Sequence, residues 1–345
     1  MPLQERLRLL VRLGDYLRER PEPLAAVMEK SQRDNPWFTL ENQEGSLSAI
    51  SDVLLRPEKL EAWLAPYALD EVPAPKTVGL VMAGNLPLVG FHDWLCVFVS
   101  GHRAQVKLSD KDPYLLPHLA EVMALFDSRV SGYTDFVSRL RNFDAVIATG
   151  SNNSARYFES YFGKYPHIIR KNRNAVGVLT GKESGEEVFL LGKDIFQYFG
   201  LGCRNVSKIF VPRDFAFEPF LERLHQDYQH LILHDKFRHN YDYNYALYII
   251  NKVDFKMNGC LLLTENHAIA SRIAGLHYAY YDRLEEVEAQ MNARKEEIQC
   301  VVAAPGLLQL ETIPFGTTQE PELWDYADGV DTIAFLQHLQ ERKDP

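Results

Sequence analysis

Cysteine is scarce in this chain, and its few copies form no cluster. They are Cys96, Cys203, Cys260 and Cys300, far apart in 345 residues and without a CxxC pair. This spacing argues against a disulfide framework or a zinc cluster, and it favours reduced thiols in a cytoplasmic protein. His234 and His239 are five residues apart and do not share a helical face, so the sequence predicts no metal site.

The chain also lacks an excess of basic residues and any long apolar run. It has 37 Lys and Arg against 47 Asp and Glu, for a net charge of -10. Nucleic-acid binding needs a surplus of cations on one face, so we do not expect nucleic acid as the main partner. No apolar run approaches the roughly 20 residues that span a bilayer. The first 23 residues are expected to form an amphipathic helix and not a signal peptide.

The apolar content of 46% is enough for two packed cores. Short apolar strands with little period-2 alternation are interspersed with helices, which is typical of an α/β fold with largely parallel sheets. A change of domain is expected near residue 172, and the tyrosines of 241–248 are expected to pack in a core. Strands are expected in 77–90, 103–109, 143–151, 174–179, 206–212, 260–264 and 297–306, and helices in 3–66, 114–126, 153–163, 216–227 and 265–273.

One cysteine stands in an unusual local sequence. Cys203 follows Gly200-Leu201-Gly202, precedes a strand and has Arg204 beside it. Glycines permit backbone conformations closed to other residues and let a substrate approach closely. Arg204 and a backbone N–H group suit a thiolate and a developing oxyanion. This pattern indicates a nucleophile, and a small residue in a tight turn is the alternative.

Three further motifs follow predicted strands, where ligands of open α/β sheets bind. Asn85 in AGNLPL offers a side-chain amide to an oxyanion, although asparagine is also common at turns. Gly150 and Ser151 stand between a strand and a helix, where amide groups and the helix dipole favour phosphate. Lys107 and Asp110 in QVKLSDKDP suit a phosphate and a ribose hydroxyl, although a solvated loop has the same composition. The GxGxxG loop of ordinary dinucleotide binding is missing.

The order and spacing of these segments resemble the aldehyde dehydrogenase superfamily. GNLPL is similar to its oxyanion segment, VKLSDKDP to its Lys-Pro-Ser-Glu cofactor loop, TGS to its pyrophosphate turn and GLGCRNVSKIFV to its nucleophile segment. EEIQCVV falls where the family carries Glu-Glu-Ile-Phe-Gly-Pro, so Glu297 corresponds to the glutamate that orients the nicotinamide ribose. NPWFTLEN, CRNVSKIFV and NYDYNYALYIIN resemble the acyl-CoA reductase branch, which includes the LuxC-like fatty acid reductases of bacterial luminescence.

This resemblance implies an aldehyde dehydrogenase-like α/β fold of two domains with an N-terminal helical segment. Residues 1–172, completed by 313–345, would form the cofactor domain, and 173–312 the catalytic domain. The cofactor would be NADPH, with NADH possible, because the branch favours NADPH whereas the Asp110 carboxylate repels a 2′-phosphate. Lys107 would lie near the adenosine ribose.

The sequence departs from the family at IIRKNRNAVGVL. Most aldehyde dehydrogenases carry Glu-Leu-Gly-Gly-Lys there, and its glutamate activates the water that hydrolyses the thioacyl enzyme. Ile169 and Arg170 stand in its place, and Glu183, Glu186 and Glu187 remain as stand-ins. Loss of this base favours the reduction of an acyl thioester over oxidation to an acid.

The predicted reaction therefore converts an acyl-CoA, or a protein-bound acyl thioester, into a fatty aldehyde. Cys203 would attack the thioester, Asn85 and the Cys203 N–H group would hold the oxyanion, and Gly150 and Ser151 would meet the pyrophosphate. The alternatives are an NAD-dependent aldehyde oxidiser, a cofactor-free acyltransferase or thioesterase, and a non-catalytic member of the fold. A second copy of the chain or an acyl-activating protein is the expected protein partner.

Overall fold

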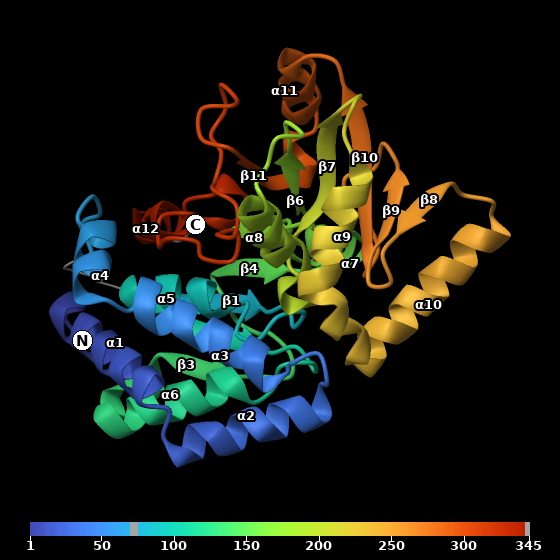
Figure 1. Cartoon of the computed structure of the whole chain (residues 1–345). Helices are drawn as coiled ribbons and strands as arrows, with labels where there is room; N and C mark the ends of the chain where they lie inside the picture. Colours follow the sequence, from blue (N-terminus) through green and yellow to red (C-terminus); the bar gives the residue numbers. More distant parts are fainter. Residues whose placement is uncertain (70–74, 342–345) are drawn as a thin grey trace. The chain divides into compact units, whose positions relative to one another are not determined.

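The computed structural model describes residues 1–69 and 75–341 (Figure 1). The chain divides into two compact units. The first comprises Met1–Asn172 together with the chain from Pro321 onward, and the second is Arg173–Glu320. The chain therefore leaves the first unit once and returns to it near its end. Within the described residues, no helix is long and apolar enough to cross a bilayer.

The first unit begins with helices, as the sequence predicts. Leucines at helical spacing along α1, such as Leu10, Leu13 and Leu17, are fully buried and form one side of its core. The Thr39 hydroxyl caps α3 by accepting a hydrogen bond from the Asn42 N–H group at 3.2 Å. The helices are α1 (Leu3–Glu19), α2 (Glu22–Asp34), α3 (Leu40–Ser48), a π-helical turn (Ala49–Leu54) and α4 (Pro57–Leu64).

The sheet of the first unit has five parallel strands in the order β3-β2-β1-β4-β5. β1 and β4 are apolar and buried along most of their length, whereas β2 and β5 alternate between buried and more exposed residues. The strands are β1 (Thr77–Val81), β2 (Arg103–Lys107), β3 (Thr134–Phe136), β4 (Ala145–Thr149) and β5 (His167–Arg170). The accompanying helices are α5 (Phe91–Val99), α6 (Leu115–Phe126), α7 (Asn152–Phe162) and the C-terminal α12 (Thr332–Glu341).

The sheet of the second unit has six strands in the order β11-β6-β7-β10-β9-β8. All neighbouring pairs are parallel except β8 with β9. The strands are β6 (Asn174–Val178), β7 (Val206–Pro212), β8 (Phe255–Met257), β9 (Leu262–Glu265), β10 (Gly275–Tyr281) and β11 (Ile298–Ala303). The helices are α8 (Gly185–Phe196), α9 (Phe217–Tyr228), α10 (Asp235–Ile250) and α11 (Leu284–Ala293). The predicted α/β class with largely parallel sheets is confirmed.

Two local predictions are wrong. The helix expected at 265–273 does not form, because side chains from neighbouring elements bind four successive backbone carbonyls of this segment and hold it in an irregular conformation. The tyrosines of 241–248 are not all core residues, since Tyr243 and Tyr245 on α10 are exposed. The donors to the 265–273 segment are Ser207 to Ile269, Lys208 to Asn266 and His267, Arg294 to His267, and a ring nitrogen of His277 that pairs with Ala268.

Candidate active site

Five of the predicted site residues lie at one edge of the first unit's sheet. β2, β1 and β4 are parallel neighbours, so their carboxyl ends meet at the same edge. Lys107 is the last residue of β2, and the loops that follow the three strands carry Asn85, Asp110, Gly150 and Ser151. The fold therefore brings these residues to a common edge, although the sequence separates them by up to 66 positions.

The loop that carries Asn85 is held closely against the loop after β2. A Cβ atom at Gly84 would lie 2.4 Å from the Ser109 hydroxyl oxygen, so only glycine permits this approach. The buried Asp112 carboxylate accepts a hydrogen bond from the Leu88 N–H group at 2.8 Å. Burial raises the pKa of Asp112 to about 6. The loop around the half-buried Asn85 is thus fixed by a carboxylate that sequence reasoning did not single out.

The other two loops present groups that fit a dinucleotide. The Lys107 and Asp110 side chains are exposed at the end of β2. Ser151 caps α7, where its hydroxyl accepts a hydrogen bond from the Ser154 N–H group at 3.2 Å. A side chain at Gly150 would meet Ser154 and Phe158 at 2.9 Å. The amide groups at the start of an eleven-residue helix favour an anion, and the binding of a pyrophosphate there stays a prediction.

Cys203 lies in a tight turn directly before β7 in the second unit. The Asn205 N–H group donates to the Gly202 carbonyl at 3.2 Å, which places Cys203 and Arg204 at the two central positions of the turn. The Cys203 side chain is half-buried. The thiol therefore lies in a tight turn before a buried strand, the environment that the sequence analysis gives as the alternative, and its role as a nucleophile stays a prediction.

The other cysteines differ from Cys203 in exposure. Cys96 and Cys260 are buried, and burial raises the pKa of both thiols, that of Cys260 to about 12. Such thiols are poor nucleophiles at neutral pH. Cys300 on β11 is half-buried like Cys203, so it is the alternative candidate for the nucleophile.

The chain reaches the Cys203 turn through a strained segment that sequence reasoning missed. Tyr198, Phe199 and Gly200 adopt successive left-handed conformations, with φ of 53°, 58° and 72°. A residue with a side chain in this region costs on the order of 1 kcal/mol. Both rings are buried, and the Phe199 ring lies 4.4 Å from that of His234 and 5.9 Å from that of Phe237, centroid to centroid. Ring burial offsets the strain and fixes the exit of the chain from α8.

The Asn205 side chain connects the Cys203 turn to the end of α8. Its Oδ1 accepts a hydrogen bond from the Gly202 N–H group at 2.7 Å. Its Nδ2 donates to the carbonyls at the end of the helix, and the residue is only 1% exposed. The acceptors and distances are Asp194 at 3.0 Å, Ile195 at 3.4 Å and Gln197 at 2.9 Å. Two neighbouring backbone segments are thus fixed by one amide, whose only trace in the sequence is an asparagine two residues after the cysteine.

Glu297 lies at the same sheet edge as Cys203. Each residue precedes a strand, β11 and β7 respectively, and β6 runs between those strands in parallel with both. Both strands also shift register against β6 near this edge, an irregularity that often accompanies active sites. Glu297 pairs with Arg294 at 2.6 Å, and this hydrogen-bonded cation lowers the pKa of the carboxyl group. Its role toward a nicotinamide ribose stays a prediction.

The glutamates considered as stand-ins for the missing base lie at the opposite edge of that sheet. Glu183, Glu186 and Glu187 follow β6, whereas Cys203 precedes the parallel β7. Five residues of strand separate the two edges by about 16 Å. Glu183 accepts hydrogen bonds within its own loop from Thr180 and Gly181, and Glu187 forms the capping box of α8. None of the three is placed to activate water at Cys203.

Arg170, which stands near the position of the family's glutamate, forms a buried ion pair in the first unit. Its buried guanidinium binds both carboxylate oxygens of Asp93 on α5 and the Thr332 hydroxyl at 3.1 Å. This pair joins the sheet, α5 and α12. A buried cation fixed in this way is no substitute for a general base.

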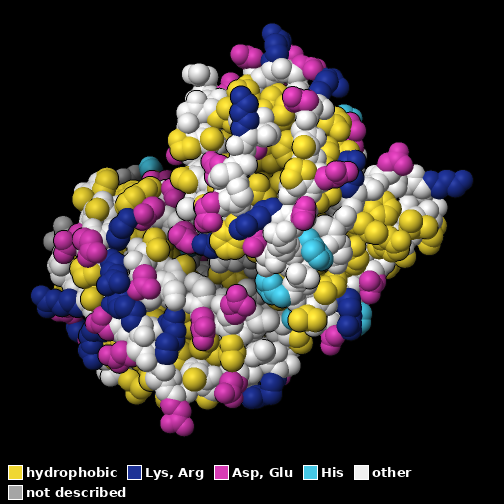
Figure 2. Space-filling model, in the orientation of Figure 1, with side chains coloured by type: hydrophobic (Ala, Val, Ile, Leu, Met, Phe, Trp, Pro, Cys, Tyr) yellow, Lys and Arg dark blue, Asp and Glu magenta, His cyan; other side chains and the backbone are white. Residues whose placement is uncertain are grey.

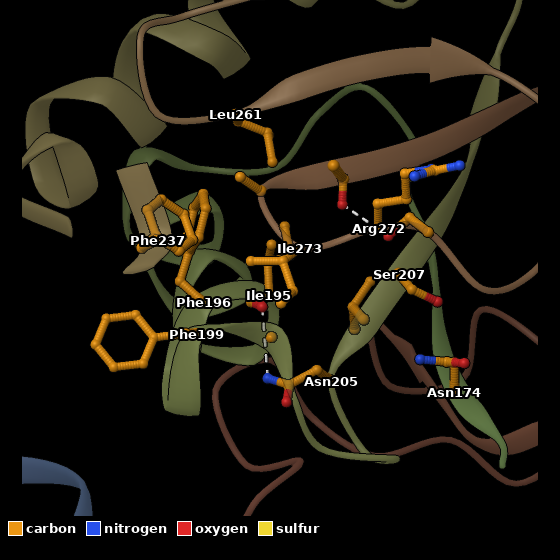
Figure 3. Close-up of a pocket in the computed structure, with 15 residues that line it drawn as sticks. Asn174, Ile195, Phe196, Phe199, Asn205, Ser207, Phe237, Leu261, Arg272 and Ile273 are labelled. Carbon is orange, nitrogen blue, oxygen red and sulfur yellow. Dashed lines mark hydrogen bonds between the residues drawn. The ribbon is translucent and has the colours of Figure 1, made fainter. Parts of the chain in front are cut away.

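A pocket in the second unit adjoins the Cys203 turn (Figure 3). Residues from both sides of the turn line it, including Phe199 and Asn205, and Phe237 lies at its apolar end. The space inside it that the centre of a water-sized sphere can reach is about 20 Å³, enough for one water molecule.

No family model matches the chain, and no curated protein matches it. Solved structures do match. An indole-3-acetaldehyde dehydrogenase from P. syringae, in complex with NAD+ and IAA, is 14% identical with a TM-score of 0.65, covering 89% of this chain and 73% of that one. The NAD+ complex of an aldehyde dehydrogenase from Bacillus cereus is 14% identical, with a TM-score of 0.63 and coverages of 90% and 73%. An oxidoreductase from Marinobacter aquaeolei is 12% identical, with a TM-score of 0.65 and coverages of 93% and 79%. At these identities the likeness concerns the fold, and we conclude that the chain has an aldehyde dehydrogenase-like fold.

Proposed function

We propose that this protein reduces an acyl-CoA, or another acyl thioester, to an aldehyde with NAD(P)H, through a thioester on Cys203. The fold supports an oxidoreductase that acts at the aldehyde level of oxidation. The partial exposure of Cys203, in contrast to the buried Cys96 and Cys260, supports its role as the nucleophile. The finer assignment to the acyl-CoA reductase (LuxC-like) branch is supported by the segments around Cys203 and α10.

The chain's own residues perform the acylation half of this reaction. The Cys203 thiolate attacks the thioester carbonyl, forming a new C–S bond while charge collects on the carbonyl oxygen. The Asn85 amide and the Cys203 N–H group would stabilise that oxygen, typically by about 3 kcal/mol per donor. The bond to CoA then breaks, and CoA leaves as a thiolate.

The reduction half requires a dinucleotide at the sheet edge of the first unit. Gly150, Ser151 and the start of α7 would hold the pyrophosphate, and Lys107 the adenosine ribose. Glu297 would orient the nicotinamide ribose. When bound, NAD(P)H supplies the hydride. Cys203 then releases the aldehyde as its C–S bond breaks, and the thiol is restored.

The observation that carries this proposal is the placement of the glutamates. An aldehyde oxidiser needs a base that activates water against the thioester. The positions that resemble the family's base hold Ile169 and Arg170, and Glu183, Glu186 and Glu187 lie at the far edge of the sheet. Without a base that activates water, a thioester on Cys203 persists until it is reduced.

Product analysis in both directions tests the proposal. Purified protein is mixed with NADPH or NADH and a series of acyl-CoA chain lengths, and separately with aldehydes and NAD+. We expect thioester-dependent oxidation of the reduced cofactor with one aldehyde formed per turnover, and only trace acid from aldehydes. Fast acid formation would instead identify an aldehyde oxidiser, and CoA release under continuous turnover without cofactor would identify a thioesterase or acyltransferase. Cys203→Ala is the control and must be inactive.

A further inference from the structure

The second unit carries an apolar surface where α10 ends and β8 begins. Figure 2 shows hydrophobic side chains gathered over the end of α10, at the right of the view. Six large apolar side chains there are between 37% and 75% exposed. We call them the α10–β8 patch: Tyr243, Tyr245, Ile249, Ile250, Val253 and Met257.

This patch is unusual for a solvent-facing helix. The buried side of α10 is defined by Phe237 and Asn244, seven residues apart. Beyond Asn244 the helix reads YALYII, which is apolar on every side, and helices of this kind are normally covered. The rings of Tyr245 and Tyr248 each lie 5.6 Å from that of Phe255 on β8, centroid to centroid. The helix and the strand therefore form one ordered surface.

The patch continues into an open sheet edge. β8 is the last strand in its sheet, and its one neighbour in the described residues is β9. Such an edge presents backbone N–H and C=O groups to any chain that can pair with it. A strand that pairs antiparallel with its own copy places residues symmetrically about a central residue.

The charges along this edge are self-complementary. With Phe255 at the centre, Asp254 of each copy stands opposite Lys256 of the other, which gives two attractive cross-strand pairs. Both side chains are exposed. A lysine on a short edge strand usually prevents pairing, but here the carboxylate opposite it removes that obstacle.

We propose that the α10–β8 patch joins two copies of this chain around a twofold axis, with their β8 strands paired antiparallel about Phe255. With roughly 150–200 Å² for each fully exposed side chain of this size, the patch offers on the order of 600 Å² of apolar surface per copy. The backbone and charged groups of β8 bring this close to the about 800 Å² per partner of a standard interface. The inference is independent of the proposed reaction.

Sedimentation velocity across a hundredfold range of concentration tests the interface. The wild-type chain is expected to sediment as a dimer, or as a multiple of one. Ile250→Glu should raise the dissociation constant of the dimer at least about tenfold, equivalent to 1.4 kcal/mol. Leu125→Glu is the matched control, because Leu125 on α6 is also exposed and apolar and lies in the other unit. Circular dichroism confirms that each variant is folded.

Charge reversal tests the register. Lys256→Asp alone places two carboxylates opposite each other and should weaken the dimer, as Asp254→Lys should with two cations. The double variant restores both attractive pairs and should restore the dimer. A wild-type chain that is monomeric at every concentration, an Ile250→Glu variant with unchanged mass, or a double variant no better than the singles would overturn the proposal.

Discussion

Replacing Asn205 by alanine should impair catalysis by Cys203, although Cys203 itself is unchanged. Asn205→Ala leaves the Gly202 N–H group and the Asp194 and Gln197 carbonyls without the partner that they have in the wild type. Each buried polar group left unsatisfied costs about 1–3 kcal/mol. Since the end of α8 can relax toward solvent, we expect the free energy of unfolding to fall by about 3 kcal/mol in total.

The turn that Asn205 holds should then lose its defined geometry. We expect the rate of Cys203 alkylation by iodoacetamide to change and the turnover number for acyl-CoA to fall at least about tenfold, or 1.4 kcal/mol in the barrier. Peptide mass spectrometry measures the first, aldehyde formation the second and urea unfolding the stability. Asn244→Ala is the matched control, because this buried asparagine in the same unit loses a single hydrogen bond, to the Ile273 carbonyl.

Asn205→Asp separates a positioning role from general destabilisation. Its carboxylate still accepts from the Gly202 N–H group but faces three carbonyl oxygens. Protonation relieves this repulsion, so we expect activity that recovers as the pH falls, unlike the wild type. A folded Asn205→Ala protein with wild-type alkylation and turnover would refute the reasoning.

Three further predictions concern the sheet edge of the first unit. Burial raises the pKa of Asp112 from 3.8 to about 6, so ionisation of the unfolded chain destabilises the native state as the pH rises from about 4 to 6. Relative to the wild type, the free energy of unfolding of Asp112→Asn should therefore rise by up to about 3 kcal/mol between about pH 4 and pH 6, as measured by urea unfolding. A difference between the two proteins that does not change with pH would contradict the raised pKa of Asp112. Asn85→Ala should lower turnover about 10²–10³-fold with unchanged cofactor affinity, and an unchanged rate would exclude Asn85 from the oxyanion site. Asp110→Asn should lower the KM for NADPH more than that for NADH, and equal changes would separate Asp110 from the ribose.

The parts of the fold that the sequence predicts are those with strong local signals. Leucine spacing defines α1, and apolar runs that end in polar or glycine-containing turns define β1, β2, β4 and β7. The loops after β1, β2 and β4 reach one sheet edge because parallel strands share their direction. The sequence alone is therefore enough to place Asn85, Lys107 and Ser151 at the same edge of the sheet.

The parts that could not be predicted depend on contacts distant in sequence. The 265–273 segment has helical spacing, yet side chains such as Lys208 and His277 bind its carbonyls and hold it in an irregular conformation. The left-handed conformations of Tyr198 and Phe199 are disfavoured locally and persist because their rings are buried. Asn205 acts through three carbonyls eight to eleven residues upstream, which no local pattern reveals.

The most direct test of the central claim is the identity of the acylated residue. The protein is mixed with an acyl-CoA in the absence of cofactor, quenched in acid and mapped by peptide mass spectrometry. The account predicts one acyl group, on Cys203, that disappears when NADPH is added before the quench. An acyl group on Cys300, or none on any cysteine while aldehyde still forms, would contradict it.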